Sequence, residues 1–245
     1  MLHTRLPSES ADFRRSRDVL RVAEVELLDQ RERVAQLRRA LPLGTVIEDY
    51  VFRECPSDLS ADDDDVHDVR ISDLFTAPDR PLVIDHLMYG KELPSPCPMC
   101  TMWVDGFKGV AHHLARNIDF AIAAAVEPAA LRAHARTRGW NRLRLLSAGD
   151  STFKYVLSSE EEGGSQDAVL SVFVRDDNGN VRHTYSVSPQ ISADVHERGI
   201  DALCTTWNDL ERPGSDATGS WRLVFLTRLR RLITPRNPQK ILEIS

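Results

Sequence analysis

The chain has 245 residues, of which 42% are hydrophobic and 28% are charged, and its formal net charge is −6. The negative charge argues against a nucleic-acid partner, because no excess of lysine and arginine is available to neutralise phosphates. No stretch approaches the roughly 20 apolar residues that span a bilayer, and the N-terminus lacks an apolar signal-peptide core. We therefore expect a soluble, cytoplasmic protein without a membrane or nucleic-acid partner.

The first predicted element is a long helix over residues 14–41, which Pro42 ends. An apolar stripe recurs along it every seven residues: Leu20, Leu27, Val34 and Leu41. Such a stripe fits a coiled-coil seam, or the face of an amphipathic helix that packs on its own domain. On the first interpretation, we predict a homodimer in which this helix takes part.

Residues 45–55 alternate enough to predict a strand, and residues 71–75 predict a short helical turn. Between them, residues 57–68 contain a run of four acids, from Asp62 to Asp65. The run lacks the glycine and the terminal glutamate of an EF-hand. We therefore interpret residues 57–68 as a solvated loop rather than a metal-binding loop.

Strands and helices alternate from residue 82 onward. The apolar run over residues 82–88 predicts a central strand that is covered on both faces. A helix over 98–116, a strand over 118–126, a helix over 128–139 and a strand over 142–146 follow. Strands over 168–175 and 181–187 flank Asn178-Gly179, a strong hairpin signal.

This order predicts an α/β fold of the thioredoxin-like type, with a central mixed sheet flanked by helices. Parallel pairing with right-handed crossovers is expected first, and the closing hairpin adds antiparallel strands. We expect an N-terminal helical extension over 1–44, the thioredoxin-like domain over 45–215 and a C-terminal extension over 216–245.

A Cys-x-x-Cys motif, Cys97 to Cys100, lies between the predicted strand over 82–88 and the helix that follows. A helix N-terminus offers unpaired N–H groups and a positive dipole end, which stabilise a thiolate at Cys97. Cys100 lies one turn deeper and is able to attack a mixed disulfide on Cys97. The motif therefore predicts a thiol–disulfide oxidoreductase that acts on a protein or small-molecule substrate, with no bound cofactor.

Four further residues are candidates for the site. Asp85 and His86 end the strand before the motif, and adjacent strand residues point to opposite faces, so only one of them lies under the dithiol. Either is a candidate proton acceptor, and a structural polar pair is the alternative. Trp103 and Tyr185 are expected to contact the substrate, although Tyr185 also fits an ordinary edge strand.

Two interpretations from other functional classes remain open. The two thiols would bind copper or zinc if nearby soft or imidazole side chains joined them, namely His86, Met99 and Met102. Zinc sites usually use two Cys-x-x-Cys pairs, and Cys55 and Cys204 do not form a second pair. We therefore expect no bound metal. The third interpretation is a non-catalytic scaffold, in a biosynthetic pathway, that has kept the fold.

Residues 97–107, Cys-Pro-Met-Cys-Thr-Met-Trp-Val-Asp-Gly-Phe, resemble the signature of an uncharacterised bacterial thioredoxin-like family, domain of unknown function eight hundred and ninety-nine. Residues 183–186, 138–140 and 49–52 also resemble its pattern. The resemblance covers about residues 41–214 and implies a thioredoxin-like fold, distantly related to peroxiredoxins. In thioredoxins, a buried acid in the preceding strand helps to deprotonate the resolving thiol, and Asp85 resembles it.

The sequence departs from the better-known relatives at two places. Residues 163–169 contain no proline, whereas thioredoxins place a cis-proline before the first hairpin strand. Peroxiredoxins carry Pro-x-x-x-Thr-x-x-Cys, and here Gly90 and Pro94 stand at the proline and threonine positions. We therefore do not expect standard peroxidase activity or thioredoxin-style substrate docking.

Overall fold

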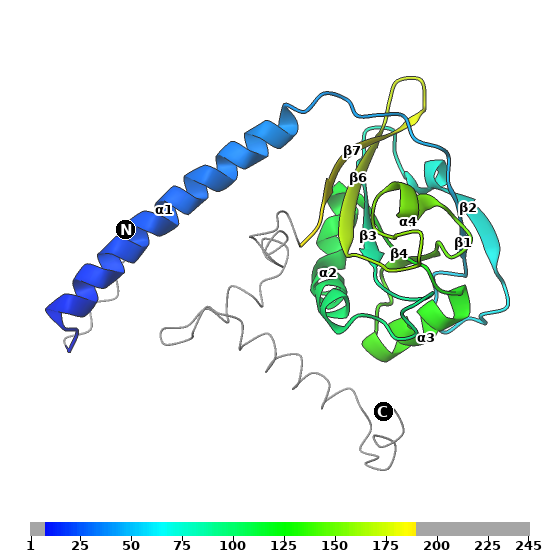
Figure 1. The fold of residues 1–245 in the computed structure, drawn as a ribbon, viewed down its shortest axis with the longest axis horizontal. Helices are drawn as coiled ribbons and strands as arrows, with labels where there is room; N and C mark the ends of the chain where they lie inside the picture. Colours follow the sequence, from blue (N-terminus) through cyan, green and yellow to red (C-terminus); the bar gives the residue numbers. More distant parts are fainter. Residues whose placement is uncertain (1–7, 190–245) are drawn as a thin grey trace, which may run out of the picture. The chain divides into compact units, whose positions relative to one another are not determined.

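The computed structural model describes residues 8–189 (Figure 1). Cys204 and the predicted C-terminal extension over 216–245 lie outside these residues. The chain divides into two compact units, and the boundary in the sequence falls between Gly44 and Thr45. Within the described part of the chain, no helix is both long enough and apolar enough to cross a membrane.

The first unit contains one helix, α1 (Ala11–Arg39). Ser10 is its N-cap, and the Ser10 hydroxyl accepts a hydrogen bond of 3.1 Å from the N–H of Phe13. Asp12 lies in the first turn, and Arg38 lies in the last turn, where their charges complement the helix dipole. The long helix predicted over 14–41 is therefore confirmed, with its start three residues earlier.

The second unit is built on a seven-stranded sheet whose order is β2-β1-β5-β4-β3-β6-β7. Its strands are β1 (Val51–Glu54), β2 (His67–Arg70), β3 (Leu82–Leu87), β4 (Asp119–Ala124), β5 (Arg144–Ser147), β6 (Val169–Arg175) and β7 (Val181–Val187). Strands β3, β4 and β5 pair in parallel, and all other pairs are antiparallel. Strand β3 is interior, between β4 and β6, and is the middle of the five strands from β5 to β7, as its apolar run predicts.

Helices cover both faces of the sheet and enclose two apolar clusters (Figure 1). Helices α2 (Pro98–Asn117) and α3 (Pro128–Arg138) pack on one face. The 3-10 helix η1 (Ile71–Leu74) and the short helix α4 (Phe153–Val156) pack on the other. Gly139 ends α3 in the left-handed region, with φ of 65°. The predicted α/β, thioredoxin-like fold is therefore confirmed.

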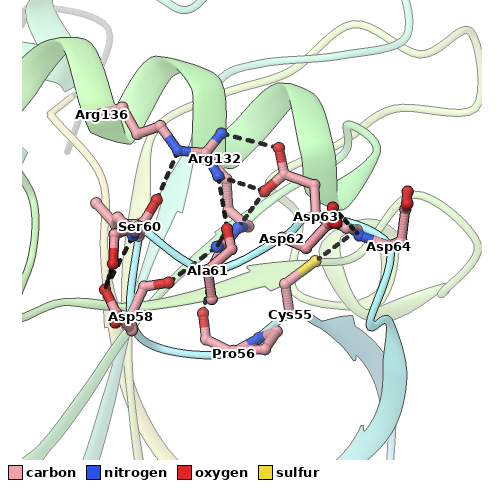
Figure 2. Close-up of polar contacts among 11 residues, drawn as sticks. Cys55, Pro56, Asp58, Ser60, Ala61, Asp62, Asp63, Asp64, Arg132 and Arg136 are labelled. Atoms are coloured by element: carbon pink, nitrogen blue, oxygen red, sulfur yellow. Dashed lines mark hydrogen bonds and ion pairs between the residues drawn. The ribbon is translucent and has the colours of Figure 1, made fainter.

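The segment between β1 and β2 differs in part from the predicted solvated loop. Three of its four acids are exposed, but Asp63 is bound by two arginines of α3 (Figure 2). Arg132 is only 3% exposed and donates to Asp63 and to the carbonyls of Pro56, Asp58 and Ala61. A polar loop thus closes around a buried guanidinium, which fixes its path across α3.

Candidate dithiol site

The two motif cysteines differ strongly in exposure. Cys97 is the N-cap of α2 and is partly exposed, whereas Cys100 is 2% exposed. The N–H of Cys97 donates to the carbonyl of Met88 over 2.9 Å, and the carbonyl of Cys97 accepts from the N–H of Thr101 over 3.0 Å. The two sulfurs are not joined in a disulfide. The helix start thus presents one sulfur to solvent and covers the other.

The loop from β3 to Cys97 is fixed by close contacts rather than by regular structure. Gly90 has φ of 95°, and a Cβ on it would lie 1.9 Å from the carbonyl oxygen of Ala125. Gln166, which is buried, donates to the carbonyl of Gly90 over 2.7 Å and accepts from the N–H of Tyr89 over 3.3 Å. Proline fixes φ near −65°, so it does not fit the Gly90 backbone. The backbone at Gly90 therefore explains why glycine stands where the peroxiredoxin pattern has proline.

A buried acid lies on the same face of the sheet as Cys100. Asp85 is 6% exposed, and burial raises its pKa to about 7, although the charge of Lys154 opposes this effect. A hydrogen bond with Cys97 and burial raise the pKa of the Cys100 thiol well above its ordinary value, and the charge of Asp85 acts in the same direction. This face of the sheet therefore carries a buried carboxyl group and a buried thiol whose protonation states are linked.

Lys154 is a buried base at this site that no sequence pattern indicates. Lys154 lies on α4, is fully buried and donates to the carbonyl of Leu87 over 3.0 Å. Burial lowers its pKa to about 8, and the charges of Cys100, Glu160 and Asp85 oppose this effect. Residues 151–157 carry neither a motif nor an apolar periodicity, so no sequence signal points to this side chain.

His86 lies on the opposite face of β3 from Asp85. Its ring stacks on Phe153 of α4, with centroids 4.9 Å apart, and its Nδ1 lies 2.6 Å from the hydroxyl of Ser159. Burial lowers the pKa of His86 well below its ordinary value. The structure therefore brings Asp85, and not His86, to the face that carries the dithiol, and it gives His86 a packing role on the other face.

The two predicted substrate contacts lie on different elements, Trp103 on α2 and Tyr185 on β7. Trp103 is 2% exposed and packs in the cluster between α2 and the sheet, so its ring has no surface left for a substrate. Tyr185 pairs with Val172 on β7, and strand β6 separates it from Asp85 on β3. We therefore assign a packing role to Trp103 and place Tyr185 on the edge strand.

His134 of α3 also lies beside the motif helix, a position that the sequence does not indicate. Its Nε2 is 3.2 Å from the hydroxyl of Thr101, and its ring contacts Tyr89 edge-on at 6.2 Å between centroids. Tyr89 directly follows Met88, the residue that accepts from the N–H of Cys97. His134 thus braces the first turn of α2 against the end of β3.

The ligand set of the metal interpretation is not brought together. His86 lies on the far face of β3, away from Cys97 and Cys100. Within residues 8–189, no group of three or more His, Cys, Asp or Glu side chains has the geometry of a metal site. The methionines beside the motif, Met99 and Met102, instead pack against the apolar cluster of this face.

Asp105 explains why the family-like motifs at residues 97–107 and 138–140 occur together. Its carboxylate accepts from the indole N–H of Trp140 over 2.8 Å and pairs with the guanidinium of Arg138. Trp140 is fully buried. These motif residues therefore join α2 to the end of α3, and they support the dithiol helix.

A family model described as "Bacterial protein of unknown function (DUF899)" matches residues 3–218. The chain belongs to this family. The family resemblance that the motif at residues 97–107 indicates is therefore confirmed for this DUF899 chain. No curated protein matches the chain.

Solved structures similar to this DUF899 chain include several peroxiredoxins. AhpC from Mycobacterium tuberculosis is 14% identical, with 73% of this chain and 98% of that chain covered and a TM-score of 0.45. Reduced Prx3 from Vibrio vulnificus, in complex with H2O2, is 18% identical over 66% and 96% of the two chains, with a TM-score of 0.42. Peroxidoxin BcpB from M. tuberculosis is 16% identical over 70% and 99%, with a TM-score of 0.43.

Proposed function

We propose that this protein is a thiol–disulfide oxidoreductase in which Cys97 is the nucleophile and Cys100 is the resolving thiol. The observation that carries the proposal is the pairing of a partly exposed Cys97, at the start of α2, with a buried Cys100 hydrogen-bonded to it. A thiolate at a helix N-terminus is stabilised by the unpaired N–H groups and the dipole. The substrate class is a disulfide of a protein or small molecule, and the reduced dithiol fits the cytoplasm.

The reaction proceeds in two displacement steps. The Cys97 thiolate attacks one sulfur of the substrate disulfide, which forms a mixed disulfide and releases the other sulfur as a thiolate. The Cys100 thiolate then attacks the Cys97 sulfur, which forms the Cys97–Cys100 disulfide and releases the second substrate thiolate. Two electrons pass from the dithiol to the substrate, and an external dithiol reductant returns them.

The second step requires that Cys100 lose its proton inside the protein. Asp85 is the acceptor in our proposal, because it is buried on the same face and its pKa of about 7 allows proton transfer near neutral pH. Lys154 stabilises the carboxylate that must receive the proton, since its positive charge acts on Asp85. The buried acid and base thus serve the resolving thiol, and the helix N-terminus serves the nucleophile.

The two steps are separable with 5,5′-dithiobis(2-nitrobenzoate), which releases one coloured thiolate in each step. In a Cys55→Ser, Cys204→Ser background, the reduced protein should release two thiolates in two phases. Cys100→Ser should release one and keep the mixed disulfide on Cys97, whereas Cys97→Ser should lose the fast phase. Turnover of insulin disulfides with dithiothreitol as reductant tests catalysis. If the two thiols react no faster than an unstructured thiol and insulin disulfides are not turned over, the oxidoreductase proposal is rejected. The interpretation as a non-catalytic scaffold then remains.

A further inference from the structure

A cavity of about 290 Å³ opens at the edge of the sheet opposite the dithiol. It is lined by the first residues of β3, β4 and β5, by the last turns of α2, and by η1 and the segment after it. Cys97 instead follows the carboxyl end of β3, where its N–H donates to the carbonyl of Met88. From Cys97 to Ala111, the first residue of α2 that lines the cavity, the helix rises roughly 20 Å. The cavity is therefore separate from the dithiol site.

The walls of this cavity are mostly apolar. Nine of its fourteen lining side chains are apolar, and they come from η1, β3, α2, β4 and the residues that flank these elements. Small-molecule sites combine such walls with a few polar groups that fix the orientation of the ligand, and their volumes are about 300–1,000 Å³. The cavity lies at the lower end of this range, so it suits a small ligand with an apolar body.

The one acid among the described residues that line the cavity is already matched. The carboxylate of Asp119 accepts from the N–H of Thr76 over 2.8 Å and from the Thr76 hydroxyl over 2.7 Å. Arg80 pairs with the same carboxylate at 3.3 Å and donates to the carbonyls of Ala115 and Ile118, over 2.8 and 2.6 Å. These bonds fix the end of α2 against the start of β4, and they neutralise Asp119.

Three guanidinium groups line the cavity, and one of them has no counter-charge. Arg80 pairs with Asp119, and Arg144 donates two bonds of 2.8 Å to the carboxylate of Glu54. Arg142 is exposed and forms no hydrogen bond or ion pair with any residue from 8 to 189. The next residue, Leu143, is 5% exposed and belongs to the apolar wall. An unmatched positive charge thus lies where an apolar cavity meets solvent.

We propose that this cavity binds a small organic carboxylate with an apolar body, such as a medium-chain fatty acid, and that Arg142 binds its carboxylate group. A planar guanidinium group matches the two oxygens of a carboxylate. One negative charge balances Arg142, whereas the second charge of a phosphate monoester would have no partner here. The apolar body of the ligand covers the walls of the cavity and removes them from water. This inference is independent of the proposed function.

Titration calorimetry of the full chain with octanoate provides the test. Octanoate should bind at one site per chain, and 1-octanol, which has the same tail without the charge, should bind at least tenfold more weakly. Arg142→Met should weaken octanoate binding about tenfold and leave octanol binding unchanged, because it removes only the charged contact. Arg116→Met is the matched control, since Arg116 is exposed on α2 but does not line the cavity. Its affinity for octanoate should stay within twofold of wild type.

A substitution in the wall tests the apolar part of the site. Ala115 lines the cavity and is exposed, so Ala115→Phe fills part of the cavity without disturbing the core, and it should weaken both ligands. Absence of octanoate binding, equal affinity for octanol, or equal losses in Arg142→Met and Arg116→Met would overturn the proposal.

Photolabelling with a medium-chain carboxylate that carries a diazirine locates the bound tail. Mass spectrometry should find the label within residues 111–121 or 142–144, and excess octanoate should suppress it. Helix α1 also exposes apolar side chains, among them Leu20 and Leu27. Labelling confined to α1 would show adsorption to that helix and would overturn the assignment of the cavity.

Discussion

Asp85 and His86 are adjacent in β3, and both are buried, yet their side chains lie on opposite faces of the sheet. Asp85 acts on the thiol of Cys100, whereas His86 packs on Phe153. The alternation of strand side chains thus places one residue on the face of the dithiol and its neighbour in the apolar cluster of the other face.

Replacing Asp85 by asparagine should slow the resolving step and stabilise the fold at high pH. The folded-state pKa of Asp85 is about 7, against an ordinary value of 3.8. Below about pH 4, Asp85 is protonated in the folded and the unfolded state, and the folded state keeps its full stability. The free energy of unfolding then falls as the pH rises through 7, because folding must keep or bury a carboxyl group that the unfolded chain ionises. Asp85→Asn should exceed wild type by up to about 4 kcal/mol at pH 8, and by little at pH 4. Urea unfolding at both pH values measures the difference.

Asp119 offers the matched control for this change. It is also buried, but its carboxylate accepts from the N–H and hydroxyl of Thr76 and pairs with Arg80. Asp119→Asn should therefore destabilise the fold at neutral pH, by loss of a charged partner. A destabilised Asp85→Asn at pH 8 would contradict the assignment of Asp85 as a desolvated acid.

Cys97 should be the first cysteine to react with iodoacetamide at pH 7. Cys100 and Cys55 are buried, and burial helps to raise the pKa of both thiols, so less thiolate is present at each. Mass spectrometry of each cysteine-containing peptide, over pH 5–9, gives the four rates separately. Faster labelling of Cys100 would reverse the two roles, and equal, slow labelling of both would reject the oxidoreductase.

Arg132→Met should strongly destabilise the protein, by about 3 kcal/mol, because it removes the positive partner of Asp63 and the donor to three carbonyls. Arg136→Met is the control on the same helix, since Arg136 binds the same carboxylate but is 36% exposed, and its effect should be much smaller. Thermal unfolding of both variants gives the comparison. Equal losses would show that burial of Arg132 does not matter.

The stripe on α1 predicts association of two copies. Leu27→Asp places a charge in the stripe and should convert a dimer into a monomer. Val25→Asp lies two residues away, on a different face of α1, and should leave the mass unchanged. Light scattering during gel filtration measures both. A monomeric wild type, or a dimer that survives Leu27→Asp, would reject the prediction.

The sequence identifies the elements with strong patterns but not those held by tertiary contacts. The covered run of β3 and the apolar face of α2 are visible as periodicity. Strand β2 (His67–Arg70) is missed because only Val69 is buried, so its four residues carry no alternation. The placement of Trp103 was predictable: it lies three residues after Cys100, on the same helix face, so burial of one implies burial of the other.

Lys154, by contrast, is a residue near the dithiol that the sequence does not predict. A lysine in an irregular segment reads as an exposed side chain, because burial of its charge is costly without partners. Its partners, the carbonyl of Leu87 and the charges of Asp85 and Glu160, come from two other segments of the chain. Only the assembled fold brings them together, so no local pattern predicts this part of the site.

Gly90 determines how substitutions around the thiols must be interpreted. A single methyl group there would overlap the carbonyl of Ala125, so any replacement pushes apart the carboxyl ends of β3 and β4 and moves the loop that precedes Cys97. A saturation library would therefore score Gly90 as intolerant as the nucleophile itself, although glycine contributes no chemistry. Loss of function at this position reports backbone shape and not the loss of a reacting group.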